Sequence, residues 1–95
     1  MIDESRFRNE QTLRLFYGER LRRYPPELAR RAQNKLKIVC AASQLDDLSV
    51  PPGNGLEALR GGRRGQWSIR INDQWRICFV WQPGQCDAVE IVDYH

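Results

Sequence analysis

The chain closes on Asp93-Tyr94-His95, a carboxylate, a phenol and an imidazole in three consecutive positions. His95 is the single histidine of the sequence, and imidazole titrates close enough to neutral pH to give or take a proton. Asp93 could move protons as well. The phenol of Tyr94, with a pKa of about 10 when free, is better suited to stack on a base. A terminal histidine can equally be a frayed chain end, and the residues alone leave that alternative open.

Arginine is the second residue type with chemical meaning. It supplies thirteen of the fifteen basic residues in a chain of 95 residues with a formal net charge of +3. Its planar guanidinium can bind a phosphate through two hydrogen bonds. Arg60, Arg63 and Arg64 lie in the glycine-rich segment 56–65, where the backbone could approach a polyanion closely. The segment lacks the Lys-Ser/Thr ending of a P-loop, and a solvated loop is the competing interpretation.

The elements that must position these residues begin with helices. Apolar spacing predicts one helix over 9–17, ended by Gly18, and a second over 27–43, opened by Pro25-Pro26. The expected apolar faces are Leu13, Phe16 and Tyr17 in the first helix and Leu28, Ala32, Leu36 and Val39 in the second.

The second half of the chain has the period-two pattern of strands. Alternating apolar residues predict strands over 67–71, 75–81 and 87–92, with a weaker signal around 55–59. We therefore expect a single α+β domain spanning residues 1–95. Its two N-terminal helices should pack on one face of a small antiparallel sheet.

The register of these strands follows from keeping the apolar side chains on one face. A three-residue connection over 72–74 pairs Ile69 with Ile77, and the next hairpin should pair Phe79 with Val89. A slip by one residue would turn every side chain to the wrong face, so this register is favoured.

The same register places Arg70 directly opposite Arg76, on the face away from the apolar layer. Like charges on one rung destabilise a sheet. A bound phosphate would neutralise the two arginines, and so would a nearby carboxylate, Glu90 or Asp93. The sequence does not choose between these two interpretations.

Several kinds of site and location are disfavoured. Cys40, Cys78 and Cys86 cannot all pair, and they form no CxxC motif, so we expect reduced thiols and no metal site. The predicted register sets Cys78 and Cys86 four rungs apart, roughly 13 Å, which is too far for a disulfide. The mean hydropathy is −0.64. No apolar run approaches the roughly 20 residues that cross a bilayer, so a cytoplasmic protein without a membrane partner is expected.

Three segments carry a resemblance to a known family. Segments 51–61, 65–79 and 89–95, with their Trp-Ser-Ile-Arg-Ile, Gln-Trp-Arg-Ile and Asp-Tyr-His motifs, resemble the HigB-type toxins of the RelE/ParE superfamily. The resemblance extends over nearly the whole chain, closely in the second half and loosely in the N-terminal helices. It implies the same fold class that the periodicity predicts.

The resemblance also implies a function. Proteins of this type are toxins of type II toxin–antitoxin systems that cleave mRNA in the ribosomal A site without a metal or other cofactor. The implied partners are a HigA-type helix-turn-helix antitoxin, the 70S ribosome with its mRNA, and operator DNA only through the antitoxin complex. The alternative is a ParE-like toxin, which poisons DNA gyrase by binding and cuts no RNA.

Site residues follow from matching positions. Arg76 matches the arginine that contacts the scissile phosphate, and Arg60 stands where many relatives have lysine. Some relatives have a histidine near Glu57, which makes this carboxylate a possible general base. An aspartate is common where this chain has Gly62. The resemblance thus implies catalytic roles for Arg76, Asp93, Tyr94, His95 and Arg60. The basic segment and the Arg70–Arg76 rung suggest RNA-binding roles for Arg63, Arg64 and Arg70.

Overall fold

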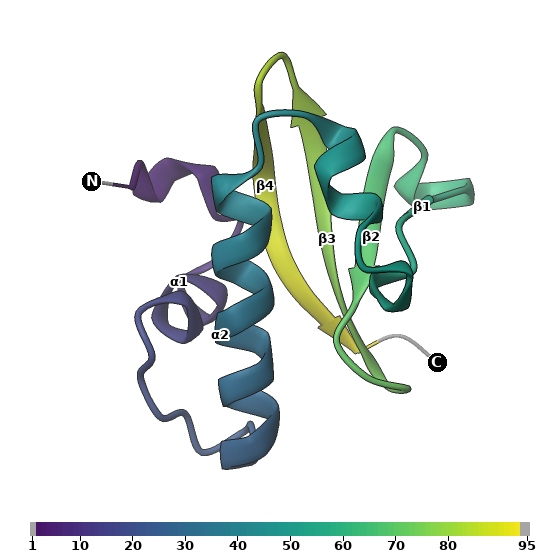
Figure 1. Ribbon diagram of the computed structural model, residues 1–95. Helices are drawn as coiled ribbons and strands as arrows, with labels where there is room; N and C mark the ends of the chain where they lie inside the picture. Colours follow the sequence, from purple (N-terminus) through teal and green to yellow (C-terminus); the bar gives the residue numbers. More distant parts are fainter. Residues whose placement is uncertain (1, 94–95) are drawn as a thin grey trace.

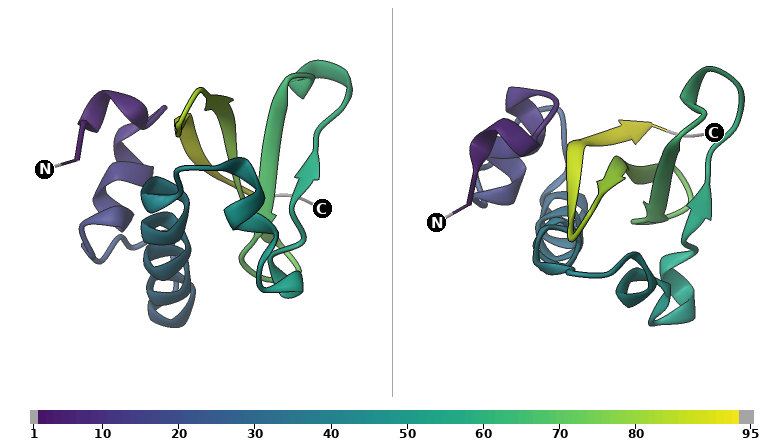
Figure 2. Two further views of the ribbon diagram at one scale, coloured as in Figure 1. Left: turned by 45° about the horizontal axis from the view of Figure 1, so that its top comes forward. Right: turned by 90° about the horizontal axis from the view of Figure 1, so that it is seen from above.

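The computed structural model describes residues 2–93 and has the expected α+β architecture, with helices on one side of a four-stranded antiparallel sheet of order β1-β2-β3-β4 (Figure 1). The two views in Figure 2 show β1 at the sheet edge far from the helices. In chain order the elements are η1 (Glu4–Arg6), α1 (Glu10–Phe16), α2 (Pro26–Ala41), η2 (Leu45–Ser49), η3 (Pro52–Asn54), β1 (Glu57–Ala58), η4 (Gly61–Arg63), β2 (Gln66–Arg70), β3 (Trp75–Gln82) and β4 (Gln85–Asp93).

The main helix, α2, forms as its sequence predicts. Pro26 occupies the first turn, where its missing N–H costs nothing, and the helix ends two residues earlier than expected. The buried positions Leu28, Ala32, Leu36 and Val39 are the four that the spacing predicted. None of the helices within residues 2–93 is long and apolar enough to cross a membrane.

The predicted apolar face of α1 is only partly correct, because Leu13 and Phe16 are partly buried against the core but Tyr17 is not. The buried residues are Thr12 and Leu15, whereas Tyr17 is half exposed and its hydroxyl donates to a Glu4 carboxylate oxygen at 2.6 Å. The reason is a polar contact with the edge strand β4. Thr12 Oγ1 accepts the backbone N–H of Ile91 at 3.0 Å, and this turns the helix so that the threonine faces the sheet.

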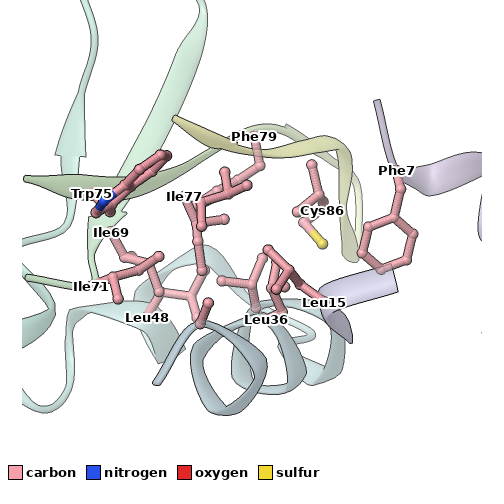
Figure 3. Packing of buried hydrophobic residues seen from close by; sticks show 14 of the residues in the cluster. Phe7, Leu15, Leu36, Leu48, Ile69, Ile71, Trp75, Ile77, Phe79 and Cys86 are labelled. Carbon is pink, nitrogen blue, oxygen red and sulfur yellow. The ribbon is translucent and has the colours of Figure 1, made fainter. Parts of the chain in front are cut away.

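The core lies between α2 and the helix-facing side of the sheet. Phe79 is the largest fully buried side chain, and Ile77 and Ile69 lie beside it on the sheet. Leu36 of α2 and Leu48 of η2 are also fully buried in the same cluster (Figure 3). One layer of apolar side chains therefore holds the helices to the sheet, and the opposite sheet face is left for polar residues.

The strand register is confirmed up to Cys78. Ile69 faces Ile77, and Arg70 faces Arg76. Beyond Cys78 the pairing shifts by one residue, so that Val80 faces Asp87 and the expected Phe79–Val89 pairing ends in a bulge.

The bulge is centred near Ala88, whose φ is +48°. A bulge adds one residue to one strand, so side chains beyond it turn to the other face. Cys86 therefore faces Trp81. The separation between Cys78 and Cys86 is three rungs, whereas the predicted register gave four.

Candidate catalytic face

The sheet face away from α2 carries a row of four paired residues, one from each strand. Glu57 faces Ser68, Ser68 faces Cys78, and Cys78 faces Glu90. We call these four residues the polar row. Strand side chains alternate in direction, so the row lies on the side opposite Ile69 and Ile77. Within the row, Ser68 and Cys78 are fully buried, and burial raises the pKa of the Cys78 thiol.

Arg76 lies beside the polar row and is fixed by three groups. Its Nε donates to Ser68 Oγ at 2.8 Å, and its Nη2 donates to the carbonyl oxygen of Gly55. The same nitrogen lies 3.7 Å from Glu57 Oε1, and only 14% of the side chain is exposed. No hydrogen bond within residues 2–93 involves Nη1, so the guanidinium is held in place with one end still available to a ligand.

The loop before β1 places the Gly55 carbonyl. Gly55 has a φ of +55°, a left-handed conformation that glycine adopts at little cost. Asn54 before it is fully buried, and its Nδ2 donates to the carbonyls of Leu48 and Val50 at 3.2 Å each. Lys35 of α2 donates to Asn54 Oδ1. The main helix thus supports the loop that holds the arginine.

Two arginines, Arg8 and Arg63, contact Glu90 at the β4 end of the polar row. Glu90 Oε1 lies 2.9 Å from Arg63 Nη1 and 3.4 Å from Arg8 Nε, and the Glu90 side chain is 15% exposed. Arg63 also donates to Gln66 Oε1 at 3.1 Å. This contact ties the basic loop around η4 to the sheet, and it uses the Glu90 carboxylate that the sequence had offered to Arg70 and Arg76.

Arg70 and Arg76 share a rung, as predicted, and each has a carboxylate close by. Arg70 contacts Asp73 in the β2–β3 turn, and Arg76 contacts Glu57. Carboxylates therefore accompany both arginines, but they are not the ones that the sequence suggested. Arg70 is exposed, and a ligand could compete with Asp73 for it in water.

Asp93 ends β4 on the other side of the sheet. It faces Trp75, and its Oδ2 accepts a hydrogen bond from Gln74 Nε2 at 3.1 Å. By strand alternation its carboxylate shares the face of Trp75, not that of Arg76. The structure therefore does not place Asp93 beside Arg76. Tyr94 and His95 lie outside the described residues.

Arg60 and Arg64 flank η4 and are exposed. Arg60 lines a shallow, open depression with Glu57, Ala58 and Leu59, next to the polar row. The structure thus places Arg60 and Arg76 near Glu57 at the β1 end of the polar row, and Arg63 at Glu90 at the β4 end. No group of three or more His, Cys, Asp and Glu side chains within residues 2–93 is arranged to hold a metal ion.

Sequence reasoning missed the two groups that orient Arg76. Ser68 gave a usable signal, because its small hydroxyl alternates with the apolar Trp67 and Ile69 and lies near Arg76 in the predicted register. The Gly55 carbonyl gave none, since its direction depends on the conformation of a loop that the pattern of residues does not specify.

A family model described as the RelE-like toxin of the type II toxin–antitoxin system HigB matches residues 5–95. The chain belongs to this family. It is a HigB-type toxin, and as a type II toxin it has an antitoxin partner.

Two relatives that carry the HigB name, and a third that does not, are similar to most of the chain. Toxin HigB-1 of Vibrio cholerae is 39% identical over 77 residues, 79% of this chain and 81% of that protein. Endoribonuclease HigB of Proteus vulgaris is 30% identical over 71 residues, 75% and 76% of the two chains. An uncharacterized protein of Haemophilus influenzae is 29% identical over 85 residues, 88% and 84% of the two chains.

Proposed function

We propose that this HigB-type toxin is a metal-independent endoribonuclease that cleaves mRNA in the ribosomal A site. The observation that carries the proposal is the Arg76 guanidinium, held by Ser68 and Gly55 beside the Glu57 carboxylate. The similarity to a protein named Endoribonuclease HigB supports it. A ParE-like toxin that acts by binding needs no such arrangement of an arginine and a carboxylate.

The proposed reaction begins at the RNA 2′-hydroxyl. Its oxygen attacks the adjacent phosphorus, the bond from phosphorus to the 5′-oxygen breaks, and a cyclic phosphate and a 5′-hydroxyl are formed. Negative charge grows on the phosphorane in the transition state. Arg76 stabilises that charge, and because its neighbours already hold it, little reorganisation is needed during the reaction.

Proton transfer requires a base and an acid. Glu57 is our candidate base, because it lies 3.7 Å from Arg76 and its side chain is 53% exposed, so a substrate hydroxyl can reach it. Asp93, Tyr94 and His95 remain the proposed C-terminal catalytic segment. Because the Asp93 carboxylate shares the face of Trp75 and not that of Arg76, we assign protonation of the leaving 5′-oxygen to His95.

The remaining arginines would bind the RNA backbone. Arg60, Arg64 and Arg70 are exposed around the polar face. Arg63 belongs to the basic loop around η4 and contacts Glu90. Arginine–phosphate contacts position a nucleic acid without reading its sequence. Such contacts suit an mRNA whose codon is positioned for cleavage by another macromolecule, and we propose that the 70S ribosome positions it.

The proposed partners follow the family. A HigA-type antitoxin with a helix-turn-helix would neutralise the toxin, and operator DNA would be bound only through the complex of the two. The site of action would then be the cytoplasm, where ribosomes and mRNA meet.

Glu57→Gln is expected to reduce cleavage about 10²- to 10⁴-fold, because glutamine keeps the size of the side chain but cannot accept a proton. Single-turnover cleavage of ribosome-bound message, with His95→Ala measured in parallel, checks this. If Glu57→Gln cleaves at the wild-type rate and His95→Ala cleaves more slowly, Glu57 is not the base.

Ribosome dependence is tested by primer extension on one defined message, either free or being translated in a reconstituted system. We expect cuts within A-site codons only when ribosomes are present. Efficient cutting of protein-free RNA at low toxin concentration would contradict ribosome dependence. Growth arrest without any cut would favour the gyrase-poison alternative.

A further inference from the structure

Two cysteines meet on the helix-facing side of the sheet, away from the catalytic face. Cys40 lies near the end of α2 and Cys86 near the start of β4, and the two thiols lie close enough for each to shift the pKa of the other. Cys86 is fully buried among the core residues near Phe7 (Figure 3). Cys78, the third thiol, belongs to the polar row on the other face.

The bulge in β4 creates this meeting. Without the extra residue, Cys86 would follow the alternation set by Val89 and turn towards the polar face. With it, Cys86 faces Trp81 and points towards α2. The pair is therefore a product of the fold's local irregularity and not of a sequence motif.

Arg6 holds the pair from a third element, η1. Its Nη2 donates to Cys86 Sγ at 3.0 Å and to the Cys40 carbonyl at 3.3 Å, and its Nε donates to the Cys86 carbonyl at 2.9 Å. The interaction with the Cys40 thiol and the charge of Arg6 lower the pKa of Cys86 to about 7, against the effect of burial. Interaction with Cys86 and burial raise the pKa of Cys40, so the thiolate, which is the reactive form of cysteine, is favoured at Cys86.

A small reagent can reach the pair from the Cys40 side. Cys40 is partly exposed and lines a shallow, largely apolar depression with Ile2, Phe16, Lys37 and Ala41. The geometry combines a reachable thiol, a buried partner thiol in contact with it, and a fixed cation beside the sulfur. This is the arrangement that a reversible dithiol–disulfide site requires.

We propose that Cys40 and Cys86 form an oxidation site, at which a peroxide or a small disulfide joins α2 to β4 through an intramolecular disulfide. With hydrogen peroxide, one thiolate attacks an oxygen, the O–O bond breaks, hydroxide leaves and a sulfenic acid remains. The partner thiol then attacks the sulfenic sulfur and water leaves as the disulfide forms. With a small disulfide, the first thiol forms a mixed disulfide and the second displaces the small thiol. Either route oxidises two thiols and reduces one oxidant.

This site is independent of the proposed ribonuclease function, because it lies on the sheet face opposite Arg76 and uses none of the arginines assigned to RNA. Its test needs no RNA. Trypsin separates the two cysteines, since cleavage after Lys37, Arg60 and Arg76 releases peptides 38–60 and 77–95. Cys78 lies in the second peptide as well, so Cys78→Ser gives an unambiguous assignment.

The experiment treats folded Cys78→Ser protein with hydrogen peroxide or glutathione disulfide and maps the peptides without reduction. We expect one linked species, 38–60 joined to 77–95, in the monomer, with the loss of two hydrogen atoms and full reversal by dithiothreitol. Unreacted thiols, or glutathione adducts and overoxidised cysteines without the link, would overturn the proposal.

A matched comparison shows whether the fold directs the pairing. In wild-type protein, the folded chain should link Cys40 only to Cys86, whereas the chain unfolded in guanidinium should also link Cys40 to Cys78. Partial digestion between the two cysteines of peptide 77–95 by a protease specific for aromatic residues distinguishes these links. Equal amounts of both links in the folded chain would also overturn the proposal.

Discussion

Replacement of Arg76 by alanine is expected to lower the single-turnover rate of message cleavage on the ribosome by about 10²- to 10³-fold, the usual cost of removing one preorganised charge-stabilising donor. The structural reason is the fixed guanidinium, which is 14% exposed and bonded to Ser68 and Gly55 before any substrate arrives. The measurement is the cleavage rate with the toxin in excess over programmed ribosomes.

Two further variants separate this role from charge alone. Arg76→Lys keeps a positive charge but loses the planar fork, so we expect it to remain well below the wild-type rate. Arg30→Ala removes an exposed arginine from α2, away from the polar face, and should cut like the wild type. Wild-type cleavage by a correctly folded Arg76→Ala protein would exclude Arg76 from the chemistry.

The Phe79→Ala substitution is expected to lower the free energy of unfolding by about 3–5 kcal/mol. Phe79 is the largest fully buried side chain of the core, and alanine would leave a cavity between the sheet and α2. Domains of this size are stable by about 5–15 kcal/mol in total. The loss should therefore appear as a large fall in the urea midpoint, measured by circular dichroism.

The control for Phe79 is an apolar residue on the surface. Ile38 of α2 is 42% exposed, so Ile38→Ala removes apolar atoms without opening a cavity, and alanine is the better helix former. We expect a change of less than about 1 kcal/mol for this variant. A Phe79→Ala protein as stable as Ile38→Ala would mean that the core is centred elsewhere.

The parts of the fold that could be predicted are those governed by repeated spacing. Four buried positions of α2 and the β2–β3 register follow from periods of 3.6 and two, because burial of one face decides both. The burial of Thr12 in α1 could not be predicted, because it accompanies a hydrogen bond from the Ile91 backbone N–H and not an apolar spacing. The bulge near Ala88 likewise could not be predicted from the alternation of apolar residues in β4.

The candidate site divides in the same way. The rung of Arg70 and Arg76 follows from the register, and it appears where expected. The partners of these arginines do not follow, because Glu57 and the Gly55 carbonyl reach Arg76 from a loop whose shape depends on the buried Asn54. The contact between Cys40 and Cys86 was missed for a related reason, the register shift that turns Cys86 inwards.

The central claim is that this toxin cuts mRNA by attack of a 2′-hydroxyl on a phosphate held by Arg76. The most direct test uses two ribosome-bound messages that differ only in one 2′-deoxynucleotide on the 5′ side of the cut. The account predicts that the all-RNA message is cleaved to a cyclic phosphate and a 5′-hydroxyl, while the substituted message stays intact at that position. Cleavage of the substituted message at the same bond, or no cleavage of either message, would contradict it.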